Sequence, residues 1–320
     1  MFDIFKNRLE LVGTLKTVTA LRVSKGRSLE PIGADLPVVK DALGRPLIPG
    51  SSFKGAMRSR LESFLRGIDP LLAANPAIEE EWAIPSQDVI QNGHRIDGMT
   101  RIKKALNDKQ NLDASQKDKQ LTETILNKTD LASLIFGSPW MSSKFQVRDL
   151  TVSPENWFGQ YQERDGVAID RDTETAADGK LYSFQVVPAG TPFEFRALVE
   201  NAEAWELGLL MIGLHQFETQ QIPIGGGRSR GLGVVALEKL QARWIDVRQD
   251  TDKTKSDPDK MKTYLKQLVG VDGNQLTAFA PIDESQRKAW VQSLISALPD
   301  QSARMAATRV VLPISSQQES

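Results

Sequence analysis

Hydrophobic and polar residues alternate along two segments of the chain, 9–23 and 193–199. A period of two residues is typical of a strand that buries one face and exposes the other. Residues 144–152 repeat this pattern over a shorter length, and 234–247 is a less regular fourth candidate. The pattern therefore predicts four strands, which are spread over most of the chain.

Two other segments, 52–66 and 204–217, repeat their apolar residues every three or four positions. This spacing predicts two amphipathic helices. The resulting order, β-α-β-β-α-β, is that of a split-βαβ, ferredoxin-like fold, in which two helices cover one face of a four-stranded antiparallel sheet. RNA-recognition modules share this arrangement, although a fold alone does not define a function.

The segments between these elements predict additions to the core. Residues 67–132 contain several Pro and Gly and then a polar helical stretch, which indicates an inserted helical segment. Residues 160–191 are charged and contain several Gly, as in a long loop, and a charged linker leads to a C-terminal helical region. We therefore expect an α+β protein with a core domain in residues 1–248 and a helical extension in 249–320.

Composition excludes several classes of site. The 320 residues include two His and no Cys, which excludes disulfides, thiolate zinc sites, iron–sulfur clusters and cysteine nucleophiles. The longest apolar run, 207–214, is far shorter than the ~20 residues that span a bilayer. The first residues lack the apolar core of a signal peptide. We therefore expect a cytoplasmic protein that makes no membrane contact.

The charge of the chain is balanced in total but uneven along its length. Its 40 Lys and Arg residues face 41 Asp and Glu residues, yet residues 22–60 carry eight basic residues against three acidic ones. Residues 225–248 carry five against two. Two solvated loops are the simpler interpretation, and one anion-binding face is the alternative if the fold brings both segments together.

The sequence Gly-Gly-Gly-Arg-Ser-Arg-Gly-Leu-Gly occupies residues 225–233, between the second helix and the fourth strand. Glycines such as Gly226 and Gly227 can leave backbone N–H groups uncovered for an anion, and Arg228 and Arg230 add charge that suits phosphate. The loop is neither a Walker motif nor a dinucleotide fingerprint, because its sequence and its position between helix and strand do not fit. We favour phosphate contact over a merely flexible connection.

A second basic motif lies at the start of the first predicted helix. Ser51 and Ser52 follow a Pro-Gly turn and have good N-cap chemistry, and Lys54 and Arg58 lie in the first turns. The free N–H groups and the dipole of a helix N-terminus favour an anion. A capped helix with a solvated basic face explains the same residues equally well.

Several of these motifs together resemble one family. Residues 48–55, residues 225–233 and the sequence Phe-Gly-Ser at 136–138 resemble the repeat-associated mysterious protein (RAMP) superfamily. Within it, the chain is most similar to the repeated backbone subunit of type III CRISPR effector complexes. Residues 33–41 resemble the loop of that subunit with the target-cleaving aspartate, and residues 169–184 resemble its protruding thumb.

This resemblance, which covers about residues 9–245, implies a modified ferredoxin-like (RRM-like) fold with a thumb hairpin at about 160–191. It implies a filament of copies along a guide RNA and cleavage of target RNA at every sixth nucleotide, with Asp35 as the catalytic residue and a divalent metal ion, Mg²⁺, as cofactor. The expected partners are guide RNA, single-stranded target RNA, other copies or related RAMP subunits, and further effector subunits. The implied RNA-binding residues are Lys40, Ser51, Ser52, Lys54, Arg58, Gly226, Gly227, Arg228 and Arg230.

The chain also departs from the family pattern. It has Arg22 where members often carry His, and it lacks the cysteine cluster that binds zinc before the Phe-Gly-Ser segment in many members. Two alternatives remain, a guide-processing endoribonuclease of the same superfamily and a structural subunit that coats guide RNA without cutting. The scarcity of His disfavours the first, and Asp35 disfavours the second.

Overall fold

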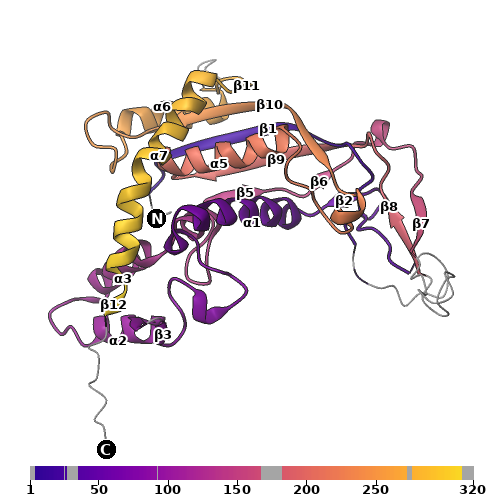
Figure 1. Cartoon of the computed structure of the whole chain (residues 1–320). Helices are drawn as coiled ribbons and strands as arrows, with labels where there is room; N and C mark the ends of the chain where they lie inside the picture. The colour runs from indigo at the N-terminus through magenta and orange to yellow at the C-terminus, as the bar shows by residue number, and fades with distance from the viewer. Residues whose placement is uncertain are drawn as a thin grey trace, which may run out of the picture.

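A five-stranded antiparallel sheet lies at the centre of the computed structural model (Figure 1). The structure describes residues 4–24, 26, 35–91, 93–166, 182–271 and 276–311. In spatial order the strands are β11 (Ala280–Pro281), β10 (Val235–Asp246), β1 (Asn7–Thr17), β9 (Pro192–Glu200) and β5 (Phe145–Val147).

Two helices connect the strands of this sheet in the predicted order. Helix α1 (Gly50–Ile68) lies between β1 and β5 in the chain, and α5 (Ala204–Glu218) lies between β9 and β10. Without β11, the spatial order of the strands is therefore fourth, first, third, second along the chain. The β-α-β-β-α-β order is confirmed for the described residues, although β1 ends at Thr17 rather than at residue 23.

The alternation of the strands produces the core. Leu9, Leu11 and Leu15 of β1 pair in register with apolar residues of β9, and all three are at most 1% exposed. Phe53 of α1 lies between the sheet and α5, with its ring centroid 4.9 Å from that of Phe195 and 4.2 Å from that of Phe217. Both helices therefore pack on the same face of the sheet, as an amphipathic pattern requires.

The predicted strand at 144–152 is interrupted. After β5 the chain bends, and β6 (Leu150–Thr151) pairs with β2 (Leu47–Ile48) in a separate sheet. The bend brings Val147 so close to the start of α1 that a Cβ atom at Gly50 would lie 2.3 Å from the Val147 carbonyl oxygen. Only glycine fits there, which explains the Pro-Gly sequence before the helix.

The inserted segment forms a small unit of its own. It is followed by the short, buried α4 (Leu131–Phe136), which the sequence pattern did not predict and which packs into the main core. The inserted unit itself contains β3 (Val89–Gln91), β4 (His94–Ile96), α2 (Met99–Asn107) and α3 (Ala114–Lys128). A separate apolar cluster of Ile84, Met99, Ile102 and Leu106 holds it together, with Trp140 packed against it.

The C-terminal residues return to the core. They form α6 (Pro258–Val269), α7 (Glu284–Ala307) and β12 (Val310–Val311). Helix α7 packs along α5, β11 joins the central sheet beside β10, and β12 pairs with β4 of the insertion. A Cβ atom at Gly208 of α5 would lie 2.2 Å from the Trp290 carbonyl oxygen, so the two helices touch at their backbones. None of the described helices is long and apolar enough to cross a membrane.

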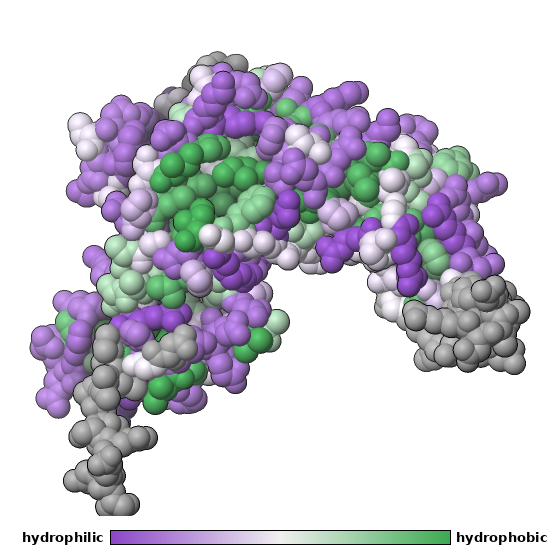
Figure 2. Space-filling model, viewed as in Figure 1, coloured by the Kyte–Doolittle hydropathy of each residue, from purple (hydrophilic) through white to green (hydrophobic). Residues whose placement is uncertain are grey.

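The molecule has the shape of an arch (Figure 1). At one end stands an antiparallel hairpin of β7 (Gln162–Gly166) and β8 (Tyr182–Val186), which falls within the predicted thumb. The rest of the resemblance at 169–181 lies outside the described residues. The insertion forms the other end, and α1 runs along the concave side between them (Figure 1). Hydrophilic surface borders much of this hollow (Figure 2).

Candidate nucleic-acid interface

Asp35 lies beside the start of β8 in the β7–β8 hairpin. Its Oδ2 atom accepts a hydrogen bond of 2.9 Å from the Ser183 N–H, and its own N–H donates to the Ser183 hydroxyl at 3.2 Å. The Leu36 N–H donates to the Ser183 carbonyl, and the Gln185 N–H donates to the Leu36 carbonyl. These bonds hold the backbone of residue 35 against β8, so the position of the carboxylate depends on the hairpin.

The two basic segments of the sequence meet beside this point. The Gly226 N–H donates to the Arg22 carbonyl at 2.8 Å, and the Arg22 guanidinium lies 4.8 Å from the ring centroid of Phe184 on β8. The Arg230 guanidinium donates to the Tyr182 hydroxyl at 2.9 Å. The glycine-rich loop, the residues after β1 and the start of β8 thus form one surface, which we call the hairpin surface (Arg22, Asp35, Tyr182–Phe184 and 225–233).

The glycines of the loop are needed for its tight backbone turn rather than for binding an anion. Gly225 and Gly233 have φ angles of 83° and 86°, and a Cβ atom on either would lie 2.2 Å from a carbonyl oxygen. The N–H groups of residues 226 and 230–233 donate to carbonyl groups of the protein. The prediction that the glycines leave their amides uncovered is therefore wrong for Gly226, Gly231 and Gly233, and the exposed side chains of Arg228 and Arg230 carry the charge instead.

The N-terminus of α1 differs from the prediction. The N-cap residue is Pro49, without a side-chain capping bond, so Ser51 and Ser52 are not the caps. The Gly50 N–H donates to the carboxylate of Asp149 at 2.9 Å, because the bend after β5 brings Asp149 there. A carboxylate of the protein thus already lies at this helix end, and Ser51 remains exposed beside it.

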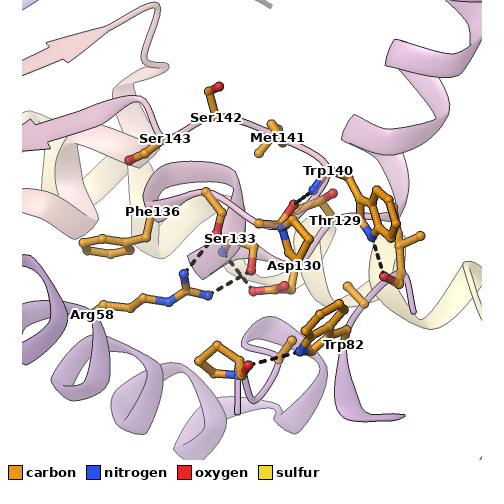
Figure 3. A pocket seen from close by; sticks show the side chains of 17 residues that line it. Arg58, Trp82, Thr129, Asp130, Ser133, Phe136, Trp140, Met141, Ser142 and Ser143 are labelled. Carbon is orange, nitrogen blue, oxygen red and sulfur yellow. Dashed lines mark hydrogen bonds between the residues drawn. The ribbon is translucent and has the colours of Figure 1, made fainter. Parts of the chain in front are cut away.

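The two basic side chains of α1 have different environments. Burial, together with the neighbouring Arg58, lowers the pKa of Lys54 to about 8. Arg58 lines a cavity of about 470 Å³ and donates to the Gly137 carbonyl at 3.0 Å and to the Ser133 hydroxyl at 3.3 Å (Figure 3). It also donates to Glu62 Oε1 at 2.6 Å. Its hydrogen bonds hold it against α4, so the structure does not place it on an exposed helix face with Lys54.

The Lys40 ammonium lies over the ring of Tyr161, with Nζ 4.3 Å from the ring centroid. It belongs to the turn between residue 39 and β2, in which the Asp41 carboxylate binds the Arg45 guanidinium. The peptide N–H groups of Leu43 and Arg45 also bind Asp41, and together with Arg45 they hold the pKa of that carboxyl below its ordinary value despite the opposing effect of burial. Asp41 is therefore a turn residue, as its spacing before Gly44 suggests.

A divalent metal ion would find few protein ligands here. Within the described ranges, no group of three or more His, Asp or Glu residues could hold a metal ion. Asp35 offers one carboxylate, of which Oδ2 is occupied by the Ser183 N–H. Mg²⁺ commonly binds through one or two carboxylates with substrate phosphates and water, so Asp35 fits such an ion only together with RNA phosphate oxygens.

Comparison with known proteins agrees with the geometry. The RAMP superfamily matches residues 14–236, which include the end of β1, all of α1, β5, β9 and α5, and the glycine-rich loop. The chain belongs to the RAMP superfamily. A protein of this superfamily from Streptococcus thermophilus, named "CRISPR system Cms endoribonuclease Csm3", is 25% identical over 243 residues, which are 74% of this chain and 90% of that protein.

Two shorter matches carry the same name. The protein from Mycobacterium tuberculosis H37Rv is 46% identical over 56 residues, and that from Enterococcus italicus is 46% identical over 57 residues. Each match covers 17% of this RAMP chain. The chain spans only about a quarter of the length of these two relatives, 24% and 27%.

Sequence reasoning about this RAMP chain missed the partner of Asp35, Ser183, and the contact of Arg22 with Phe184. In the sequence, residue 183 is only part of the segment that resembles the thumb, and Arg22 is only a departure from the family pattern. The polar Tyr182-Ser183 pair at the start of an alternating segment is a weak local signal. Ser183 lies 148 residues after Asp35, so only the fold reveals the contact.

Proposed function

We propose that this chain is a backbone subunit of a type III CRISPR effector complex, which binds guide RNA and cleaves complementary target RNA at regular six-nucleotide intervals. In this proposal the sheet with α1 and α5 is a ferredoxin-like core, the β7–β8 hairpin is the thumb, and the insertion and the C-terminal helices are additions. The observation that carries the proposal is the position of Asp35, which hydrogen bonds fix beside the start of β8 in the thumb, near the basic glycine-rich loop.

The chemistry follows from that position. Arg228 and Arg230 are exposed and can bind phosphate oxygens, while Asp35 can accept the proton of a ribose 2′-hydroxyl. The 2′-oxygen then attacks the adjacent phosphorus in line and forms a 2′,3′-cyclic phosphate. The bond from phosphorus to the 5′-oxygen of the next nucleotide breaks, and that oxygen takes up a proton from water to become a 5′-hydroxyl. A bound Mg²⁺, held by Asp35 and RNA phosphates, would stabilise the negative charge on the phosphate.

The proposed partners are guide RNA, single-stranded target RNA, other copies of this chain or related RAMP subunits, and further effector subunits. The concave side of the arch supports this assignment, because α1 and the hairpin border the same hollow (Figure 1). The names of the relatives support an RNA-cleaving activity within a CRISPR system.

The decisive experiment replaces the Asp35 carboxylate in the reconstituted complex. Asp35→Asn keeps an oxygen that accepts from the Ser183 N–H but removes the base, so we expect target cleavage to fall by about 10²–10⁴ with guide and target binding unchanged. Asp41→Asn is the matched control, because Asp41 is bound to Arg45 and its turn, and it should cleave normally. Regularly spaced cutting that persists with Asp35→Asn would leave the chain a structural, RNA-coating subunit.

A further inference from the structure

Three aromatic residues gather between β6 and β7, beside the turn that carries Lys40. The ring centroid of Trp157 lies 5.2 Å from that of Phe158 and 4.9 Å from that of Tyr161. Lys40 Nζ lies 4.3 Å from the Tyr161 centroid. We call Lys40, Trp157, Phe158 and Tyr161 the aromatic platform.

Part of the platform is anchored, and part of it faces solvent. Trp157 and Tyr161 pack partly against the main core, and the Tyr161 hydroxyl donates to the Gly44 carbonyl at 2.6 Å. Phe158 is 63% exposed, and Leu43, next to Gly44, is 76% exposed. A large apolar ring that rigid neighbours hold at the surface can be covered by a ligand with little loss of conformational entropy.

The charges around the platform suit a base with a single phosphate beside Lys40. Lys40 contributes an ammonium group, and the one carboxylate in the Lys40 turn, Asp41, is bound to Arg45. Burial and the Asp41 charge raise the pKa of Tyr161 to about 12, so its hydroxyl stays neutral at physiological pH. Glu155 and Glu163 are exposed in the same stretch of chain and point to a base, with a single phosphate near Lys40, rather than to a phosphate-dense strand.

One short segment of the chain joins the platform to the hairpin surface. Residues 35–40 run between the two, and Leu36, Val38 and Lys40 each form a bridge to a neighbouring strand or loop. At ~3.4 Å per residue, an extended segment of this length spans about 17 Å. An RNA strand that passes Asp35 can therefore reach the platform.

We propose that the aromatic platform binds one unpaired base of single-stranded RNA by stacking on Phe158, with Lys40 near the adjacent phosphate. Aromatic rings with a nearby cation are the common means by which proteins hold single-stranded RNA without reading its sequence. The inference rests on the proposed function and adds a base-binding contact to it.

The test measures the affinity of the full chain for a short, labelled oligoadenylate by fluorescence anisotropy over a range of salt concentrations. Phe158→Ala should weaken binding by about 5- to 100-fold without changing the slope of log affinity against log salt, because no phosphate contact is lost. Phe158→Trp should restore the affinity. A strand of equal length whose sugars lack bases should bind the unaltered protein and Phe158→Ala equally.

The matched control is Phe64→Ala. Phe64 is 37% exposed on α1 and has the Arg60 guanidinium 4.7 Å from its ring centroid, so it is a similar aromatic and cation pair outside the platform. It should bind oligoadenylate like the unaltered protein.

If Phe158→Ala binds oligoadenylate as tightly as the unaltered protein does, the platform is overturned and the proposed function stands. This holds whether or not Phe158→Ala also loses self-association. Loss of self-association would then identify the patch as a protein contact. No binding of oligoadenylate by the unaltered protein would overturn both.

Discussion

Arg58 and Arg228 show how the fold separates residues that look alike in sequence. Both belong to basic motifs of the RAMP pattern, yet Arg58 makes three hydrogen bonds at the cavity beside α4, whereas Arg228 is exposed in the glycine-rich loop. The buried Glu62, whose side chain is 5% exposed, depends on Arg58 and Arg66 for its charge partners. Arg58 therefore has a structural role in the free protein, and Arg228 does not.

Joint replacement of Arg228 and Arg230 by Ala should weaken RNA binding by about 10- to 100-fold, since charge-assisted bonds are lost, while the melting temperature stays the same. Arg58→Ala should instead lower the free energy of unfolding by about 1–3 kcal/mol, because Glu62 loses a partner. Anisotropy titrations and thermal melts of the same samples separate the two effects. A strong loss of RNA affinity in Arg58→Ala with unchanged melting would place Arg58 on the RNA after all.

At the scale of elements, a buried ion pair ties β5 to α5. Lys144, next to β5, lies 2.6 Å from both carboxylate oxygens of Glu206 in the first turn of α5, and their side chains are 9% and 1% exposed. Burial raises the pKa of Glu206, and Lys144 opposes this rise. Glu206 also accepts the Glu203 N–H and so completes the capping box of the helix.

Lys144→Met should cost about 3–5 kcal/mol of unfolding free energy, because it leaves Glu206 as a buried charge without its partner. The loss should be smaller at about pH 5 than at about pH 7. The folded-state pKa of Glu206 lies above its unfolded value, so stability returns as the pH falls and the carboxyl takes up a proton. Denaturant titrations at both pH values check this, and adding Glu206→Gln should remove the pH dependence. An equal loss at both pH values would contradict it.

At the scale of the whole molecule, each copy of the arch offers, among its described residues, only a few cations that remain available to bind RNA. With Arg58 engaged inside, the candidates are Lys40, Lys54, Arg228 and Arg230. Each phosphate contact of a single strand contributes ~0.7 to the negative slope of log affinity against log salt, so four contacts give a slope of about −3. Filter-binding titrations of single-stranded RNA of unrelated sequences measure this slope, and a flat response would contradict phosphate binding altogether.

Much of the architecture is legible in the sequence. Periods of two and of about 3.6 residues depend only on neighbours along the chain, so they predicted the strands and helices of the core and their order. The bend after β5 and the helix α4 were missed, because the first depends on the approach of Gly50 to Val147 and the second spans only six residues. The motifs can also be predicted from the sequence, because each consists of neighbouring residues along the chain.

The environment of each charge was decided by tertiary structure. Arg58 meets Ser133, 75 residues away, the Gly50 N–H meets Asp149, 99 residues away, and Asp35 meets Ser183 across 148 residues. No local pattern encodes such partners, because hydrogen bonding and desolvation depend on which side chains the packed core brings within a few ångströms. Local sequence was thus sufficient to name the basic motifs and Asp35, and packing alone turned Arg58 inward and joined Arg22, the glycine-rich loop and the start of β8 into one surface.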